Sequence, residues 1–212
     1  MSFPEINYRI PAPILGVDGV LPKGPRRMIT LLTNRGILQP GEMAAIHDMQ
    51  QLEQDILARI KAYQPGDAPL PIFHRIQIWG GSTGRNIYTR NGGFCSENVI
   101  PHYLTLINGC NHIVDLNPES LNAAFDIIHV FNANVRNIGV SFITKHTRFW
   151  LSRTLGENAL PIYDTVMANN IMEQNKAKEQ DIVPYWNQMI AQAEDEGISL
   201  VALERILFHY FN

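Results

Sequence analysis

The segment from Glu42 to Tyr63 carries apolar residues at helical spacing, and this pattern constrains the fold more than any other feature of the chain. Pro40 and Gly41 precede the segment and Pro65–Gly66 follow it, so we predict one amphipathic helix over residues 42–63. Its apolar positions recur three or four residues apart: Met43, Ile46, Met49, Leu52, Ile56 and Ile60. Such a helix must bury that face against further elements.

Further helices are predicted along the rest of the chain, and no run of alternating apolar and polar residues indicates a strand. Asn117 before Pro118 is a typical helix start, and Gly156 is a typical stop. Residues 64–95 are rich in turn signals. The further predicted helices span residues 97–108, 118–131, 142–155, 165–172, 184–194 and 200–211.

The chain is therefore expected to be mainly α and to form one compact unit. Residues 1–40 are rich in proline and glycine, and we predict an irregular N-terminal extension that wraps around the helical domain of residues 41–212. Of the 212 residues, 45% are hydrophobic and 17% are charged, which is typical of a globular protein with a substantial core.

Composition also indicates the compartment. No apolar stretch reaches the roughly 18–20 residues that span a bilayer, and the N-terminus lacks a secretory pattern. Cys95 and Cys110 could form one bridge at most, and free thiols are the more common state in such a chain. We expect a cytoplasmic protein without a membrane partner.

The net charge of −3 gives no global attraction to nucleic acid, but the basic residues are clustered. Acidic residues gather in the C-terminal quarter, which favours one basic face and an acidic back. Three stretches hold basic residues and no acidic one: Lys23, Arg26, Arg27 and Arg35; Arg75, Arg85 and Arg90; Arg136, Lys145, Arg148 and Arg153.

Lys145 and Asp164 are the residues with the most specific chemistry. On a helix over residues 142–155, Phe142, Lys145 and Phe149 share one side, an apolar–cationic–apolar stripe that suits the wall of a cleft. The helix start and the neighbouring Arg148 disfavour a protonated lysine, and a neutral amine is a nucleophile. Asp164 is a predicted N-cap, a position that favours the carboxylate. By spacing alone, most such pairs are structural.

The surrounding residues raise that expectation. The run Gly139-Val140-Ser141-Phe142-Ile143-Thr144-Lys145, followed by Leu160-Pro161-Ile162-Tyr163-Asp164, resembles the helix-hairpin-helix family of base-excision DNA glycosylases. The likeness is to the 8-oxoguanine DNA glycosylases and to bacterial proteins that share their fold. It covers about thirty residues, from Ile138 to Met167, and a looser likeness that includes Trp79-Gly80-Gly81 extends over residues 70–172.

The resemblance implies a helix-hairpin-helix glycosylase fold and a repair reaction on damaged DNA. An oxidised purine would be flipped into a pocket, Lys145 would attack C1′ to form a Schiff base, and Asp164 would support the positive charge. β-Elimination would then cleave the strand. We expect DNA contacts from Asn137, Gly139, Ser141 and Arg148, a base pocket formed by Phe142, Phe149 and Trp79, and no metal or other cofactor.

Several alternatives stay open. A catalytically inactive module with the same fold, binding nucleic acid or a protein, is the second hypothesis, because Ser141 stands where the family hairpin has a glycine. It predicts that Lys145 and Asp164 lie apart or that side chains fill the cleft. Trp79 is also a candidate core residue, and Gly80–Arg85 is either a phosphate-binding loop or a simple turn. Late aromatic residues could close the pocket or serve in helix packing: Phe208, Tyr210 and Phe211.

Overall fold

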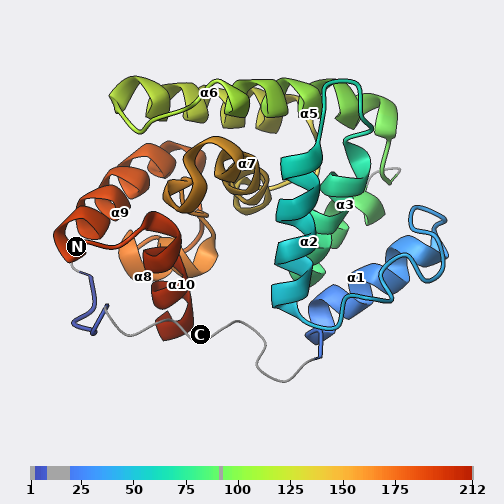
Figure 1. Ribbon diagram of the computed structural model, residues 1–212, viewed down its shortest axis with the longest axis horizontal. Helices are drawn as coiled ribbons and strands as arrows, with labels where there is room; N and C mark the ends of the chain where they lie inside the picture. Colours follow the sequence, from blue (N-terminus) through green and yellow to red (C-terminus); the bar gives the residue numbers. More distant parts are fainter. Residues whose placement is uncertain (1–2, 9–19, 91–92, 212) are drawn as a thin grey trace.

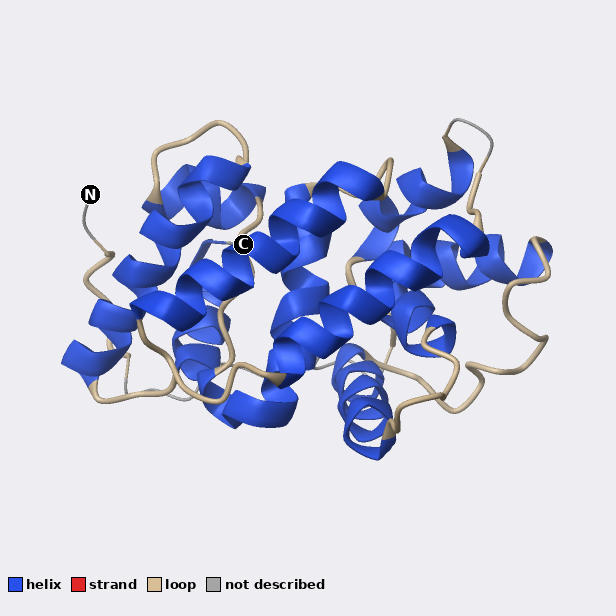
Figure 2. Cartoon of the chain, turned by 90° about the horizontal axis from the view of Figure 1, so that it is seen from above, coloured by secondary structure: helices blue, strands red, loops and turns tan. Residues whose placement is uncertain are grey.

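The computed structural model describes residues 3–8, 20–90 and 93–211, and all regular elements in these ranges are helices (Figures 1 and 2). The α-helices are α1 (Lys23–Asn34), α2 (Met49–Ala62), α3 (Leu70–Trp79), α4 (Asn86–Thr89), α5 (Ser96–Asn111), α6 (Pro118–Asn134), α7 (Val140–Leu155), α8 (Thr165–Ile171), α9 (Ile182–Glu196) and α10 (Leu200–Phe211). Three 3-10 helices join them: η1 (Gly81–Arg85), η2 (Gly156–Asn158) and η3 (Glu179–Asp181).

Helix caps explain where several elements begin. The prediction of a helix over residues 42–63 is confirmed from Met49 onward; the helix starts there because the Asp48 side chain accepts the N–H of Gln51 at 2.8 Å. Asn117 and Ser120 cap α6 reciprocally, as in a capping box. Asp164 caps α8 by accepting two backbone N–H groups. Each of these caps bonds to backbone groups two or three residues away along the chain, so the helix start depends on local sequence.

The turn-rich interpretation of residues 64–95 is wrong for its central part, which forms α3, η1 and α4. Residues 72–78 of α3 are all buried, so this helix has no solvent face and no amphipathic period. Pro69 and Pro71 at its start also read as turn signals in the sequence, although proline is well tolerated in the first turn of a helix. A fully buried helix is therefore hidden from a search for periodicity.

Residues 1–40 are not irregular throughout. Helix α1 begins directly after Pro22, and Pro25 sits in its first turn, where a missing backbone N–H costs nothing. Met28 and Leu32 bury one face of α1, which packs against α3 and η1. Residues 9–19 of the predicted extension lie outside the described residues.

Helix α7 is the centre of the fold, and every residue from Phe142 to Leu151 is buried. It packs against α2, α3, α5 and α6. In Figure 1, α2 and α3 lie on one side of α7, and α8, α9 and α10 lie on the other. Residues of α7, of α2 and α3, and of α8 and α10 line one common cavity. Among the described residues, no helix has the length and apolar character to cross a membrane.

Candidate active site

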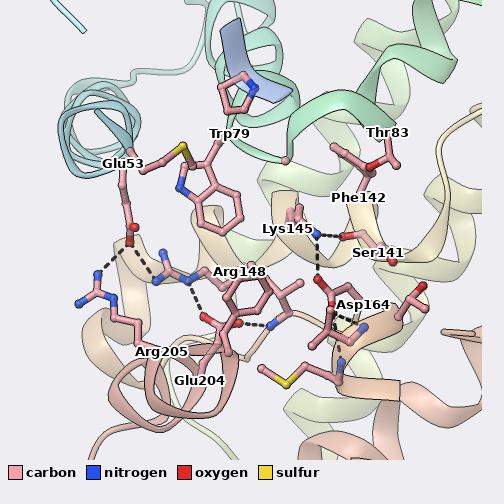
Figure 3. Close-up of a pocket in the computed structure, with 18 of the residues that line it drawn as sticks. Glu53, Trp79, Thr83, Ser141, Phe142, Lys145, Arg148, Asp164, Glu204 and Arg205 are labelled. Carbon is pink, nitrogen blue, oxygen red and sulfur yellow. Dashed lines mark hydrogen bonds and ion pairs between the residues drawn. The ribbon is translucent and has the colours of Figure 1, made fainter. Parts of the chain in front are cut away.

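A cavity of about 440 Å³ lies against α7 and holds both Lys145 and Asp164 (Figure 3). Its wall also comes from the start of α1, from α2, from the α3–η1 junction and from α10. Pro22, Thr83, Thr165 and Arg205 are exposed residues of this wall, so the cavity reaches the molecular surface. The lining residues include Glu53, Trp79, Gly80, Thr83, Ser141, Phe142, Lys145, Arg148, Asp164, Glu204 and Phe208.

Lys145 and Asp164 are in direct contact. The Lys145 Nζ atom lies 3.5 Å from Asp164 Oδ2, and it donates to the carbonyl of Ser141 at 3.4 Å. The other carboxylate oxygen, Oδ1, accepts the N–H groups of Val166 at 3.0 Å and Met167 at 3.2 Å. Oδ1 of Asp164 therefore caps α8, and Oδ2 forms the ion pair with the Lys145 amine.

A second pair of residues brings the first pair together. Thr144 accepts the N–H of Tyr163 at 3.2 Å, which fastens the extended segment before α8 to the first turns of α7. Lys145 directly follows Thr144, and Asp164 directly follows Tyr163. The spacing of nineteen residues works because the chain runs along α7, reverses at η2 and returns in extended form beside its own starting turn.

Burial disfavours the charged form of Lys145. The side chain is only 9% exposed, and desolvation lowers the pKa of the amine below its usual value of 10.5, although the carboxylates of Asp164 and Glu204 oppose this shift. The lysine also lies over the Phe142 ring, with Nζ 5.2 Å from the centroid. A larger neutral fraction is what a nucleophilic amine needs.

Phe142 forms part of the cavity wall because two glycines leave room for its ring. A Cβ on Gly80 would lie 2.2 Å from Phe142 Cε1, and a Cβ on Gly84 would lie 2.9 Å from the same atom. The segment Gly80–Arg85 is therefore a packing element built around a 3-10 helix. This close approach explains Gly80 and Gly84 without a bound phosphate, and Gly81 has a positive φ of 77°.

The three predicted base-pocket residues are only partly brought together. Trp79 is partly buried and lines the cavity with Phe142. Phe149 has no exposed surface and lies behind Trp79, with ring centroids 5.3 Å apart in an edge-to-face arrangement. It supports the wall instead of lining it, because α7 is covered on nearly all sides.

Arg148, which the sequence analysis expects to contact DNA, lines the cavity and is engaged in buried ion pairs. Only 3% of the residue is exposed, and its guanidinium is shared between two carboxylates. Its Nη2 donates to Glu53 at 3.2 Å, and its Nε forms an ion pair with Glu204 at 3.4 Å, without hydrogen-bond geometry. Arg205 donates to the same Glu53 oxygen at 2.9 Å. These residues form a network of ion pairs in the wall of the cavity (Figure 3).

The predicted hairpin residues lie at the start of α7. Asn137 has a left-handed backbone, with φ of 65°, and its side chain donates to the Arg90 carbonyl at 3.4 Å. Gly139 is exposed and offers no side-chain cap to α7, which leaves the first amide groups of the helix for an external acceptor. Ser141 lines the main cavity, whereas Asn137 lines a separate one of about 530 Å³.

Glu53 and Glu204 are site residues that the sequence analysis missed. Glu53 shares a buried helical face with Ile56 and Ile60, and Glu204 lies among the buried leucines of α10. An acidic residue on an apolar face was the available signal, because a carboxylate is rarely buried without a partner. Burial raises the pKa of Glu204, while Arg148 and the N–H of Ile162 oppose the shift.

Cys95 and Cys110 do not form a disulfide and, among the described residues, do not belong to a cluster of metal-ligating side chains. Cys95 is exposed and Cys110 is buried, and both are free thiols. Within the described ranges, no three His, Cys, Asp or Glu side chains converge as a metal ion requires.

Comparisons of the chain with protein-family models, with curated proteins and with solved structures find no match.

Proposed function

We propose that this protein is a DNA glycosylase and abasic-site lyase that removes an oxidised purine through a Schiff base on Lys145. The contact between Lys145 Nζ and Asp164 Oδ2 inside a surface-connected cavity carries the proposal. The resemblance of residues 138–167 to the 8-oxoguanine DNA glycosylases suggests the substrate.

The cavity suits a single nucleotide turned out of the duplex. A volume of about 440 Å³ falls within the usual range for small-molecule sites. Trp79, Phe142 and Phe208 supply aromatic surface for a base, and the ion pairs of Lys145 and Arg148 lie in the same cavity wall. Chemistry on C1′ requires such extrusion, because that atom is inaccessible within the stacked helix.

The residues define a reaction in which atoms and charge balance. The neutral Lys145 amine attacks C1′, the C1′–N9 bond breaks, and the bonding electrons leave with the base, which takes up a proton. Asp164 stabilises the positive charge that develops on the sugar. The bound amine loses one proton, the C1′–O4′ bond of the sugar ring then breaks as O4′ takes up a proton, and the C1′=N bond of the protonated Schiff base forms. Removal of a C2′ proton then expels the 3′ phosphate by β-elimination.

The non-catalytic alternative required a separated pair or a filled cleft. Lys145 and Asp164 are instead in contact, and the cavity beside them has room for a base. The geometry of the described residues therefore supports the enzymatic proposal over the inactive module.

Borohydride trapping tests the proposal. The protein is incubated with duplex DNA containing 8-oxoguanine, and reduction is expected to yield a covalent complex that Lys145→Gln abolishes. Lys61→Gln removes an exposed lysine of α2 and serves as the matched control, with trapping unchanged. Absence of a Lys145-dependent complex with 8-oxoguanine and with other oxidised bases would refute the proposal.

A further inference from the structure

The start of α1 carries a cationic stripe beside the mouth of the cavity. Lys23, Arg26 and Arg27 are exposed and are spaced as neighbours on one face of the helix. None of them forms an ion pair within the described part of the chain. Arg85 of η1 is also exposed, and η1 packs directly against α1. We call Lys23, Arg26, Arg27 and Arg85 the basic rim.

Two contacts place the basic rim at the cavity. Pro22 and Pro25, which flank Lys23 in sequence, line the cavity together with Thr83 of η1. A Cβ on Gly24 would lie 3.1 Å from the backbone N of Ser82, so the first turn of α1 touches η1. The first turn of α1, which carries the stripe, therefore borders the cavity beside η1.

Electrostatic interactions within α1 disfavour a cluster of basic residues at its start. Lys23 is the first residue of α1, where the helix dipole disfavours a cation, and the first turn contains no acidic residue. Like charges three and four residues apart also repel one another. Residues that go against the preferences of their own helix tend to lie at functional sites, where a binding partner compensates for the unfavourable interaction.

The geometry points to the basic rim as a binding surface for the phosphates of the DNA strand whose nucleotide enters the cavity. This inference rests on the proposed function. A nucleotide that enters the cavity remains linked to its neighbours, so its flanking phosphates stay at the mouth. The start of α7 borders the cavity at Ser141, and α1 and η1, which carry the basic rim, border it at Pro22, Pro25 and Thr83. One DNA strand can therefore contact both the start of α7 and the basic rim.

The test compares two triple variants that remove equal charge. The rim variant is Lys23→Gln/Arg26→Gln/Arg27→Gln. The control variant is Lys61→Gln/Arg153→Gln/Lys176→Gln, which changes exposed cations of α2, α7 and the α8–α9 connection. The probe is duplex DNA with a tetrahydrofuran abasic-site analogue, which cannot form a Schiff base. Binding is measured over a range of salt concentrations.

The plot of log affinity against log salt concentration is expected to become less steep by about 2–3 in the rim variant, because each lost phosphate contact contributes about 0.9. The control variant is expected to keep the wild-type slope. If α1 unfolds in the triple variant, as seen by circular dichroism, the single change Arg26→Gln is expected to reduce the slope by about 0.9.

Equal slopes in the rim and wild-type proteins overturn the inference, as does an equal loss in both triple variants. Failure of the wild-type protein to bind DNA, or binding to anionic vesicles or acidic protein instead, also overturns it. A failed borohydride trapping together with the expected change in slope would refute the lyase chemistry and leave the phosphate surface standing.

Discussion

Thr144 and Tyr163 form the bond that sets the register of the candidate site. The Thr144 hydroxyl accepts the N–H of Tyr163 at 3.2 Å and lies 3.3 Å from the Tyr163 carbonyl. Lys145 and Asp164 directly follow these residues, and their side chains meet at 3.5 Å. One buried hydroxyl therefore holds a nucleophile and its carboxylate together across nineteen residues of chain.

The first prediction concerns this hydroxyl. Thr144→Val keeps the shape of the side chain but leaves the buried N–H of Tyr163 without its acceptor, so we expect a loss of about 1–3 kcal/mol in unfolding free energy. Trapping of Lys145 on 8-oxoguanine DNA is expected to fall at least about tenfold, the equivalent of roughly 1.4 kcal/mol. Chemical denaturation and trapping rates measure the two effects.

Thr147→Val is the matched control for this substitution. Thr147 is equally buried, but its hydroxyl donates only to the carbonyl of Ile143 in its own helix. We expect a change of under about 1 kcal/mol and normal trapping. Similar losses of trapping in both variants would show that Thr144 does not set the register.

The second prediction is the pH dependence of the trapping reaction. Burial lowers the pKa of Lys145, so the neutral amine is expected to accumulate, and the trapping rate to level off, below the usual lysine pKa of 10.5. The unfolded chain binds more protons between the folded and unfolded pKa values, so stability should rise with pH in that window. Trapping rates from pH 6 to 10 would locate the pKa; a rise continuing to the end of this range would contradict the prediction.

The third prediction concerns the glycine beneath Phe142. Gly80→Ala would place a Cβ 2.2 Å from Phe142 Cε1, and the ring must move. Overpacking of this kind costs typically about 1–3 kcal/mol, and displacement of Phe142 is expected to impair trapping as well. The matched control is Gly139→Ala: its Cβ would meet nothing within 4 Å, so the melting temperature should change little. Equal melting temperatures for the two variants would contradict the close packing.

The fourth prediction separates a structural role of Arg148 from DNA binding. Arg148→Met leaves Glu204 and Glu53 without a buried partner, and loss of one member of a buried pair costs roughly 3–5 kcal/mol. The raised pKa of Glu204 allows this carboxyl to become neutral, which favours the lower end of that range. Denaturant unfolding provides the measurement.

Arg205→Gln provides the contrast, because its side chain is 43% exposed; it should cost under about 1 kcal/mol. If Arg148→Met unfolds no more easily than Arg205→Gln, the buried ion pairs of Arg148 contribute little to the stability of the fold.

The fifth prediction is a loss of stability in acid. Burial lowers the pKa of His146 to about 3 and that of His74 to about 4, from an ordinary value of 6.5. Below pH 6.5 the unfolded chain binds these protons and the folded chain does not, so stability should fall as the pH drops from about 6.5 toward 4. Between pH 6.5 and pH 4 the effect is on the order of 3 kcal/mol for each histidine.

The partners of His146 define its neutral tautomer. The Gln77 side-chain amide donates to His146 Nε2 at 3.1 Å, so the neutral ring carries its proton on Nδ1 and donates it to the Tyr103 hydroxyl at 3.0 Å; this hydroxyl also accepts from the Trp150 indole at 2.7 Å. Urea denaturation between pH 4 and 7 tests the slope, and His209→Gln, at an exposed position of α10, should leave it unchanged. A flat profile would show that these histidines are protonated in the fold.

The amino-acid sequence by itself determined the elements that depend on neighbours along the chain. Caps such as Asn117 and Asp164 bond to groups two or three residues away, and the amphipathic period of α2 reflects its own half-exposed face. The pairing of Lys145 with Asp164 was also predicted, because its residues lie within a single contiguous motif.

Tertiary structure decided what depends on distant residues. Helix α3 is buried all round, so its sequence carries no period, and the role of Gly80 becomes clear only when Phe142 of α7 lies against it. Arg148 reads as a basic residue in the sequence, yet Glu53, ninety-five positions away, neutralises it in the interior. Burial and pairing across the chain set the charge and accessibility of these groups, and no local pattern records them.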